Sequence, residues 1–158
     1  MVEEQIQQVS DDYLAGVYDS RGIIMLSSTR KTRRTKTGVK YSLINPSVYI
    51  KLNHIPPVIF DRINEITNKR VYTAYLKKSH GRKPAIVIKK LSSIRAFLLV
   101  VGPKCIVKQE ITRRLLKFCE LRMLHIRSKM VAEEKRLVQE IILLQGNLPV
   151  PDRDESIR

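Results

Sequence analysis

The chain has 158 residues, of which 43% are hydrophobic and 28% charged, a composition typical of one globular domain and not of a disordered segment. Lysine and arginine number 30 against 15 acidic residues, which gives a formal net charge of +15. This excess favours a polyphosphate partner, because neutralising phosphates releases condensed counterions. A membrane partner is not expected, since the sequence has neither a basic amphipathic helix nor a lipidation signal, and no apolar run is long enough to cross a bilayer.

The cysteines and histidines argue against a disulfide framework and against a zinc site. Cys105 and Cys119 are isolated in the sequence, which fits reduced and buried thiols. His54, His80 and His125 have no second ligand at metal-binding spacing. The N-terminal residues are acidic and lack the apolar region of a secretory signal. We therefore expect an intracellular protein, in the cytoplasm of a prokaryote or in an organelle.

The charge is divided unevenly along the chain. Residues 1–20 carry five acidic residues and no lysine or arginine, whereas residues 21–60 carry eight basic residues and no acidic one. Residues 61–110 carry twelve basic residues and three acidic ones. This distribution indicates that the middle of the chain faces an anionic ligand.

The first predicted elements are a helix and two strands. Residues 10–20 form a helix that Ser10 or Asp11 caps and Gly22 ends. Residues 23–32 and 41–53 form strands on either side of a basic hairpin tip, and Pro46 indicates a bend or bulge in the second strand. One face of that strand carries Val48, Ile50 and Leu52, and the other carries Tyr49, Lys51 and Asn53.

The same helix–strand–strand order then repeats. Residues 56–67 form a helix that begins at a pair of prolines, and residues 70–78 and 84–90 form a second hairpin around a turn at 79–82. Ser92 or Ser93 caps the next helix, which stops before Gly102. From residue 108 to residue 146 apolar residues recur at helical spacing.

These elements predict an α+β protein with an αββαββα core and an additional C-terminal helix. We expect an N-terminal extension over residues 1–9, a single domain over residues 10–146, and a frayed tail over residues 147–158.

The first helix carries a short motif whose residues are Leu14, Ala15, Gly16, Asp19 and Gly22. The segment resembles the motif of the LAGLIDADG homing endonucleases, and the predicted αββαββα order resembles their core. The resemblance implies an intron-encoded, site-specific endonuclease of the single-motif type, which cleaves double-stranded DNA as a homodimer with Mg²⁺ or another divalent cation. It also implies that the motif helices of two subunits pack together through Leu14, Ala15, Gly16 and Tyr18.

The resemblance extends to further candidate site residues. The segment PKCIVKQEI, residues 103–111, is similar to the stretch that carries the family's catalytic lysine, which corresponds to Lys108. Asn53 is a candidate for the polar residue that positions water. Asp19 and Ser20 are the candidates that remain for a metal.

One position departs from the motif. The acid that binds the metal in the family corresponds here to Arg21, and a guanidinium group cannot ligate Mg²⁺ or lose its proton. We therefore expect an enzyme that is inactive or weak as this chain stands. A local shift that lets Asp19 take over the acid's role remains an alternative.

The strand alternation and the basic hairpins predict how DNA is bound. A strand of ten residues spans about 33 Å, close to one turn of B-DNA, so a dimer covers a pseudo-palindrome of about 20 base pairs. The residues that we expect to contact DNA are Ser27, Thr29, Arg30, Lys31, Arg33, Arg34, Tyr49, Lys51, Thr73, Tyr75, Lys77, Arg82, Lys83, Val87 and Lys89.

Two other functions stay open on the sequence. One is a DNA-binding protein on the same fold that recognises a site and does not cleave it. The other is a splicing helper, or maturase, that binds intron RNA. Competition between intron RNA and duplex DNA would separate the two.

Overall fold

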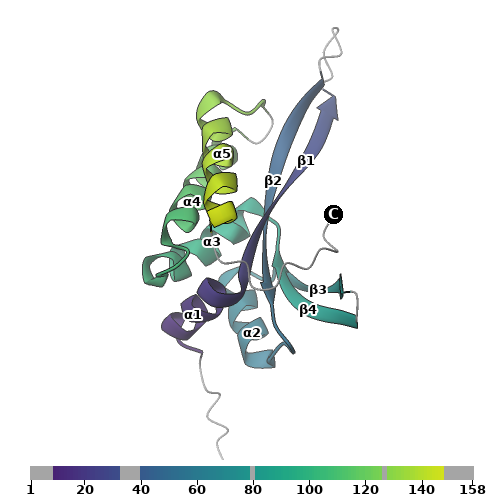
Figure 1. The fold of residues 1–158 in the computed structure, drawn as a ribbon, viewed down its shortest axis with the longest axis vertical. Helices are drawn as coiled ribbons and strands as arrows, with labels where there is room; N and C mark the ends of the chain where they lie inside the picture. Colours follow the sequence, from purple (N-terminus) through teal and green to yellow (C-terminus); the bar gives the residue numbers. More distant parts are fainter. Residues whose placement is uncertain (1–8, 33–39, 79–80, 126–127, 148–158) are drawn as a thin grey trace, which may run out of the picture.

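A computed structural model of the chain describes residues 9–32, 40–78, 81–125 and 128–147. These residues form an antiparallel four-stranded sheet with helices gathered on one side of it (Figure 1). The elements in chain order are α1 (Asp11–Arg21), β1 (Gly22–Thr32), β2 (Lys40–Lys51), α2 (Pro57–Ile66), β3 (Val71–Lys78), β4 (Gly81–Ile88), α3 (Leu91–Val101), the short 3₁₀ turn η1 (Gly102–Lys104), α4 (Gln109–Leu124) and α5 (Ala132–Asn147). The predicted α+β class and αββαββα order are confirmed, and the region after α3 forms two helices, α4 and α5.

The ends of α1 follow from its sequence. The Ser10 hydroxyl accepts a hydrogen bond from the Tyr13 amide at 3.1 Å, so Ser10 is the cap, and two aspartates in the first turn favour the helix dipole. At the other end the Gly22 amide donates to the Tyr18 carbonyl. A Cβ atom on Gly22 would lie 2.5 Å from that carbonyl oxygen and 2.6 Å from the Tyr18 ring, so only glycine fits there.

The strands are ordered β1-β2-β4-β3, and three rows of paired residues cross all four of them. Two rows face the helices, namely Gly22–Ile50–Ile86–Thr73 and Ile24–Val48–Ile88–Val71. Their isoleucines and valines belong to the core, whereas Thr73 is exposed. The third row, Ile23–Tyr49–Val87–Tyr72, faces away from the helices. We call that side of the sheet the outer face.

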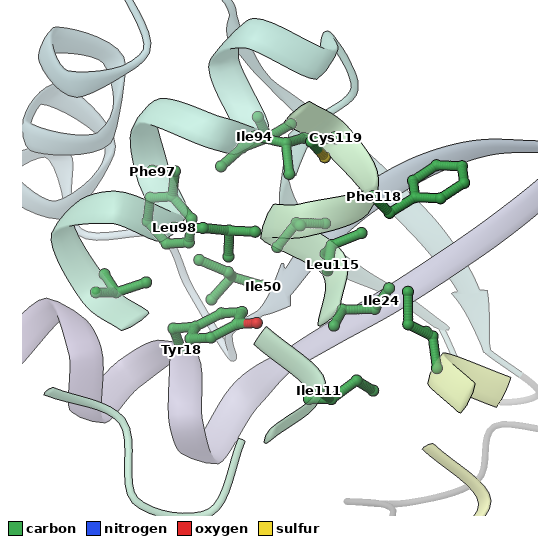
Figure 2. Close-up of a cluster of buried hydrophobic side chains, with 14 of the residues drawn as sticks. Tyr18, Ile24, Ile50, Ile94, Phe97, Leu98, Ile111, Leu115, Phe118 and Cys119 are labelled. Atoms are coloured by element: carbon green, nitrogen blue, oxygen red, sulfur yellow. The ribbon is translucent and has the colours of Figure 1, made fainter. Parts of the chain in front are cut away.

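The core fills the space between the sheet and the helices α1, α3, α4 and α5 (Figure 2). Tyr18 lies at its centre, with its ring edge-on to Phe97 at a centroid distance of 5.5 Å. The Tyr18 hydroxyl is hydrogen-bonded to the Thr112 hydroxyl at 2.8 Å, which satisfies a polar group that is fully buried. Burial raises the pKa of Tyr18, so the phenol is neutral.

Three local predictions are wrong. Of the bend or bulge expected at Pro46, the bulge is absent, because Pro46 pairs with Leu26 in a register that runs without interruption along β1 and β2. Helix α3 begins at Leu91, and Ser93 lies inside it, where its hydroxyl donates to the Thr67 carbonyl at 3.3 Å instead of capping the helix. The expected turn at 79–82 is shorter, because Gly81 already begins β4.

Helices α4 and α5 pack against each other through a buried ion pair. Arg122 lies 2.9 Å from Glu134, and both side chains are almost completely buried. Within the described ranges, no helix is both long enough and apolar enough to cross a bilayer.

Candidate functional site

The C-terminal end of α1 presents Arg21 to solvent. Arg21 is the last residue of the helix and is exposed. Among the residues that the structure describes, its guanidinium group makes no hydrogen bond or ion pair with another side chain. A permanently charged group is therefore free to bind an anion at this point.

Asp19 is engaged on both of its carboxylate oxygens. One oxygen accepts the amides of Ile106 and Val107, each at 3.0 Å, and the other accepts the amide of Lys108 at 2.7 Å. Burial alone would raise the pKa of this carboxyl group, yet these amides and the Lys108 charge hold the pKa below its usual range. Asp19 thus caps the backbone that leads into α4.

Lys108 completes this contact from the other side. Its side chain is buried, and its ammonium group donates to the main-chain carbonyl of Asp19 at 2.5 Å. Burial lowers the pKa of Lys108, although the nearby Asp19 opposes the shift. The lysine therefore neutralises the negative end of the α1 dipole, and it does not extend into solvent.

The other candidate site residues lie outside this contact. The Ser20 hydroxyl donates to the Gly16 carbonyl at 2.8 Å, so it is turned back along its own helix. Asn53 is exposed just after β2 and helps to line an open hollow. The residues that line this hollow are Asn53, His54, Ile55, Pro57, Phe60, Asp61, Thr73 and Pro84, and neither Asp19 nor Lys108 is among them.

These residues do not fit a divalent cation. Asp19 has no free carboxylate oxygen, Ser20 is bonded to the backbone, and Arg21 would repel a metal. In the described part of the chain, no three side chains of the His, Cys, Asp or Glu type gather where they could hold a metal ion.

The surface of α1 differs from the predicted one. Leu14, Ala15 and Tyr18 are at most 1% exposed and pack into the chain's own core, so they are not available to a partner. Gly16 is exposed, and a Cβ atom there would meet nothing within 4 Å. With Tyr13 and Ser20, which are also exposed, Gly16 forms a surface stripe at helical spacing.

The outer face of the sheet is polar towards the distal part of β1. Ser27 and Thr29, two of the residues that we expect to contact DNA, are exposed. The Asn45 side chain donates to the Thr29 hydroxyl at 2.6 Å, and the Ser27 hydroxyl donates to the Asn45 carbonyl at 3.3 Å. Hydrogen-bonding groups are therefore held in fixed positions across two strands.

No family model matches the sequence, and no curated protein matches it. Solved structures do resemble the fold. The homing endonuclease I-TnaI is 13% identical, with 95% of each chain covered and a TM-score of 0.58. The archaeal intron-encoded homing endonuclease I-Vdi141I, complexed with DNA, is 15% identical over 90% of this chain and 86% of that chain, with a TM-score of 0.56.

This chain has the fold of the LAGLIDADG homing endonucleases. A third similar structure, the LAGLIDADG homing endonuclease I-SmaMI bound to cleaved DNA, is 14% identical with a TM-score of 0.58. The match covers 94% of this chain but 46% of I-SmaMI, so this chain corresponds to about half of that enzyme. Structures of a further homing endonuclease, I-CvuI, were determined with the I-CreI target in the presence of Mg, where the DNA was not cleaved, and with its own target in the presence of Ca.

On the LAGLIDADG fold, one predicted groove residue, Thr73, lies on the side of the sheet that faces the helices. Thr73 pairs with Ile86, in a row that faces the helices, and it lines the hollow beside α2. Tyr75 and Lys77 were predicted from the same alternation, and in the register of β3 and β4 they pair with Pro84 and Arg82. Tyr72 is the β3 residue in the outer row, and it was missed.

The remaining predicted contacts are placed as follows. Tyr49, Lys51 and Val87 lie on the outer face, with Val87 buried under its neighbours. Arg30 and Lys31 belong to the distal part of β1, and Arg82 and Lys83 to the start of β4. Arg33 and Arg34 lie outside the described residues.

Proposed function

We propose that the protein is a sequence-specific, double-stranded DNA-binding protein on the homing-endonuclease fold, and that it does not hydrolyse DNA with a metal ion. The observation that carries the proposal is Arg21, exposed and unpaired among the described side chains, at the end of the motif helix. Support for a DNA partner comes from the net charge of +15 and from similar structures that contain DNA.

In this proposal the positive charge of Arg21 attracts the DNA phosphate, as a bound metal ion would. Its guanidinium group is planar, always charged, and matches two oxygens of a phosphate. It can hold a phosphate near the end of α1, but it cannot lower the pKa of water or accept its proton. The outcome is metal-independent binding without cleavage.

The proposed assembly is a symmetric homodimer through the exposed stripe of α1. Gly16 is the residue in this stripe that lets two helices approach closely, because no side chain separates the backbones. A two-fold axis there would bring two Arg21 side chains near one another and align two outer faces along about 20 base pairs. Intron RNA is the competing ligand that an assay should include.

The test compares the wild-type chain with Arg21→Asp on a duplex selected from a random library. We expect the wild-type protein to bind the duplex and leave both strands intact with Mg²⁺ present. The variant restores a carboxylate and tests whether its loss explains the absence of cleavage that we expect of the wild-type protein. Equal cleavage by both proteins would show that Arg21 does not block the chemistry.

A further inference from the structure

The acidic side chains of α1 are all engaged within the chain itself. Asp11 lies 3.0 Å from Arg62, and Asp12 pairs with Lys104. Asp19 accepts three backbone amides of the segment that leads into α4. Each carboxylate of this helix therefore already has a cation or a set of amides as its partner.

The shortage of free acids extends beyond α1. Residues 21–60 contain no acidic residue. In the described ranges, every acidic side chain except Asp61 is held by a cation or by backbone amides. Asp61 lines the hollow beside Asn53, and Arg21 is not among the residues of that hollow. A second copy of the chain brings the same engaged acids, so it does not offer Arg21 a partner either.

Two positive charges lie at the C-terminal end of α1. Arg21 is exposed, and Lys108 is buried with its ammonium group against the carbonyl of Asp19. A helix C-terminus ordinarily repels anions, because its carbonyl groups carry a partial negative charge. Lys108 offsets this charge, so the surface at Arg21 is open to an anion.

In the proposed dimer the two Arg21 guanidinium groups come close together. Arg21 is the last residue of α1 and directly follows Ser20, which belongs to the exposed stripe. The axes of packed helices lie about 8–10 Å apart, and a guanidinium group does not lose its charge. This separation is similar to the Debye length at physiological salt, roughly 8 Å, so screening is incomplete and the two charges repel each other.

Exposed apolar groups beside α1 favour association. Tyr13 in the stripe is 58% exposed, and Ile106 and Val107, whose amides Asp19 holds, are 85% and 54% exposed. Burying such groups stabilises a dimer, whereas the two Arg21 charges oppose it. The balance between these effects depends on whether an anion lies between the guanidinium groups.

We propose that Arg21 couples dimerisation to phosphate binding, so that the free dimer is weak and bound phosphate strengthens it. The coupling rests on the proposed function and adds a regulation of its dimer. The ligand is a phosphate group, of DNA or of inorganic phosphate, because a guanidinium group matches two phosphate oxygens. Since coupling between sites is reciprocal, dimerisation raises the affinity for phosphate by the same factor.

The test measures the dimer dissociation constant of the full chain by analytical ultracentrifugation. One buffer contains chloride alone, and a second contains inorganic phosphate at the same ionic strength, which keeps general screening equal. A third contains chloride and a duplex selected from a random double-stranded library. For the wild-type chain we expect phosphate and the duplex each to tighten the dimer by about tenfold or more.

The Arg21→Gln variant removes the charge. Its dimer should be tighter than that of wild type in chloride and should not respond to phosphate. At concentrations where it is dimeric, it should bind the duplex more weakly, because the phosphate contact is lost. A variant that is merely destabilised would weaken both dimerisation and duplex binding, so opposite signs of the two effects identify the coupling.

Two further variants separate local charge from other effects. Arg70→Gln is the matched control, because it removes an exposed arginine between α2 and β3, and its dimer should respond to phosphate as wild type does. Arg21→Lys keeps the charge and loses the planar group that matches two oxygens. Its dimer should stay weak in chloride and should gain less from phosphate than the wild-type dimer.

Two results overturn the coupling and leave the proposed DNA binding standing. One is a wild-type dimer that is equally tight in chloride and in phosphate. The other is an equal change in Arg70→Gln and Arg21→Gln, which would assign the effect to net charge. A chain that stays monomeric even on a bound duplex overturns the coupling and the proposed dimer together. If no duplex is enriched from the library, the proposed function itself fails.

Discussion

The carboxylate of Asp19, at the end of α1, accepts the backbone amide of Lys108 at 2.7 Å, and the Lys108 ammonium group donates back to the Asp19 carbonyl. This reciprocal pair joins two segments that are 89 residues apart in the chain. Asp19 and Lys108, which correspond to functional positions of the family in the sequence comparison, therefore hold the end of the motif helix. What remains exposed at that end is Arg21.

Asp19→Ala should destabilise the fold. The change leaves three backbone amides without their acceptor, which costs about 1–2 kcal/mol of unfolding free energy, as for the loss of a helix cap. Urea unfolding followed by circular dichroism measures the loss. Asp12→Ala is the matched control, because Asp12 is exposed and makes a surface ion pair, and it should change stability by less than about 0.5 kcal/mol. Equal effects of the two changes would contradict a capping role for Asp19.

The same carboxylate predicts a pH dependence. Its pKa is lower in the folded state than the ordinary value of 3.8, so its contribution is present above that value and is lost as the pH falls through the folded pKa. The Asp19→Asn variant has a neutral amide at this position, and this amide does not titrate. The stability difference between wild type and Asp19→Asn should therefore be constant near neutral pH and shrink below about pH 4. A difference that stays constant down to pH 2 would show that the ionised carboxylate is not what stabilises the contact.

The two glycines of the motif should respond oppositely to alanine. Gly22→Ala places a methyl group 2.5 Å from the Tyr18 carbonyl oxygen and should cost about 1–3 kcal/mol of folding stability. Gly16→Ala meets no atom within 4 Å and removes a flexible residue from a helix, so monomer stability should be unchanged or higher. Chemical unfolding measures both effects.

Gly16→Ala also tests the proposed dimer. If two α1 helices pack through this position, the methyl groups separate them, and sedimentation should show a weaker dimer. Val58→Ala, at an exposed position of α2 that does not belong to the proposed stripe, is the control for a surface change. Unchanged dimerisation by Gly16→Ala would place the interface elsewhere.

Much of the fold could be predicted because the residues that begin and end its helices are recognisable in the local sequence. The Ser10 cap, the stop at Gly22 and the prolines before α2 fix three helix ends without any knowledge of tertiary structure. The alternation of β2 was assigned correctly, since Val48 and Ile50 are the more apolar set.

The faces of β3 and α1 could not be predicted in the same way. In β3 each alternating set contains a tyrosine and a lysine, so composition does not separate them, and only the pairing of Thr73 with Ile86 shows that Thr73 faces the helices. In α1 the residues Leu14 and Ala15 are apolar, and apolarity alone does not distinguish the chain's own core from a partner's surface. The Asp19–Lys108 contact likewise depends on long-range packing.

The most direct test of the central claim is the dissociation constant of a selected duplex, measured with Mg²⁺ and with a chelator in the same monovalent salt. Excess monovalent salt keeps the added screening by Mg²⁺ small. Because Arg21 takes the place of a metal-binding acid, the two constants should agree and the duplex should be recovered intact. Binding that requires Mg²⁺, or strands cut in its presence, would contradict the account.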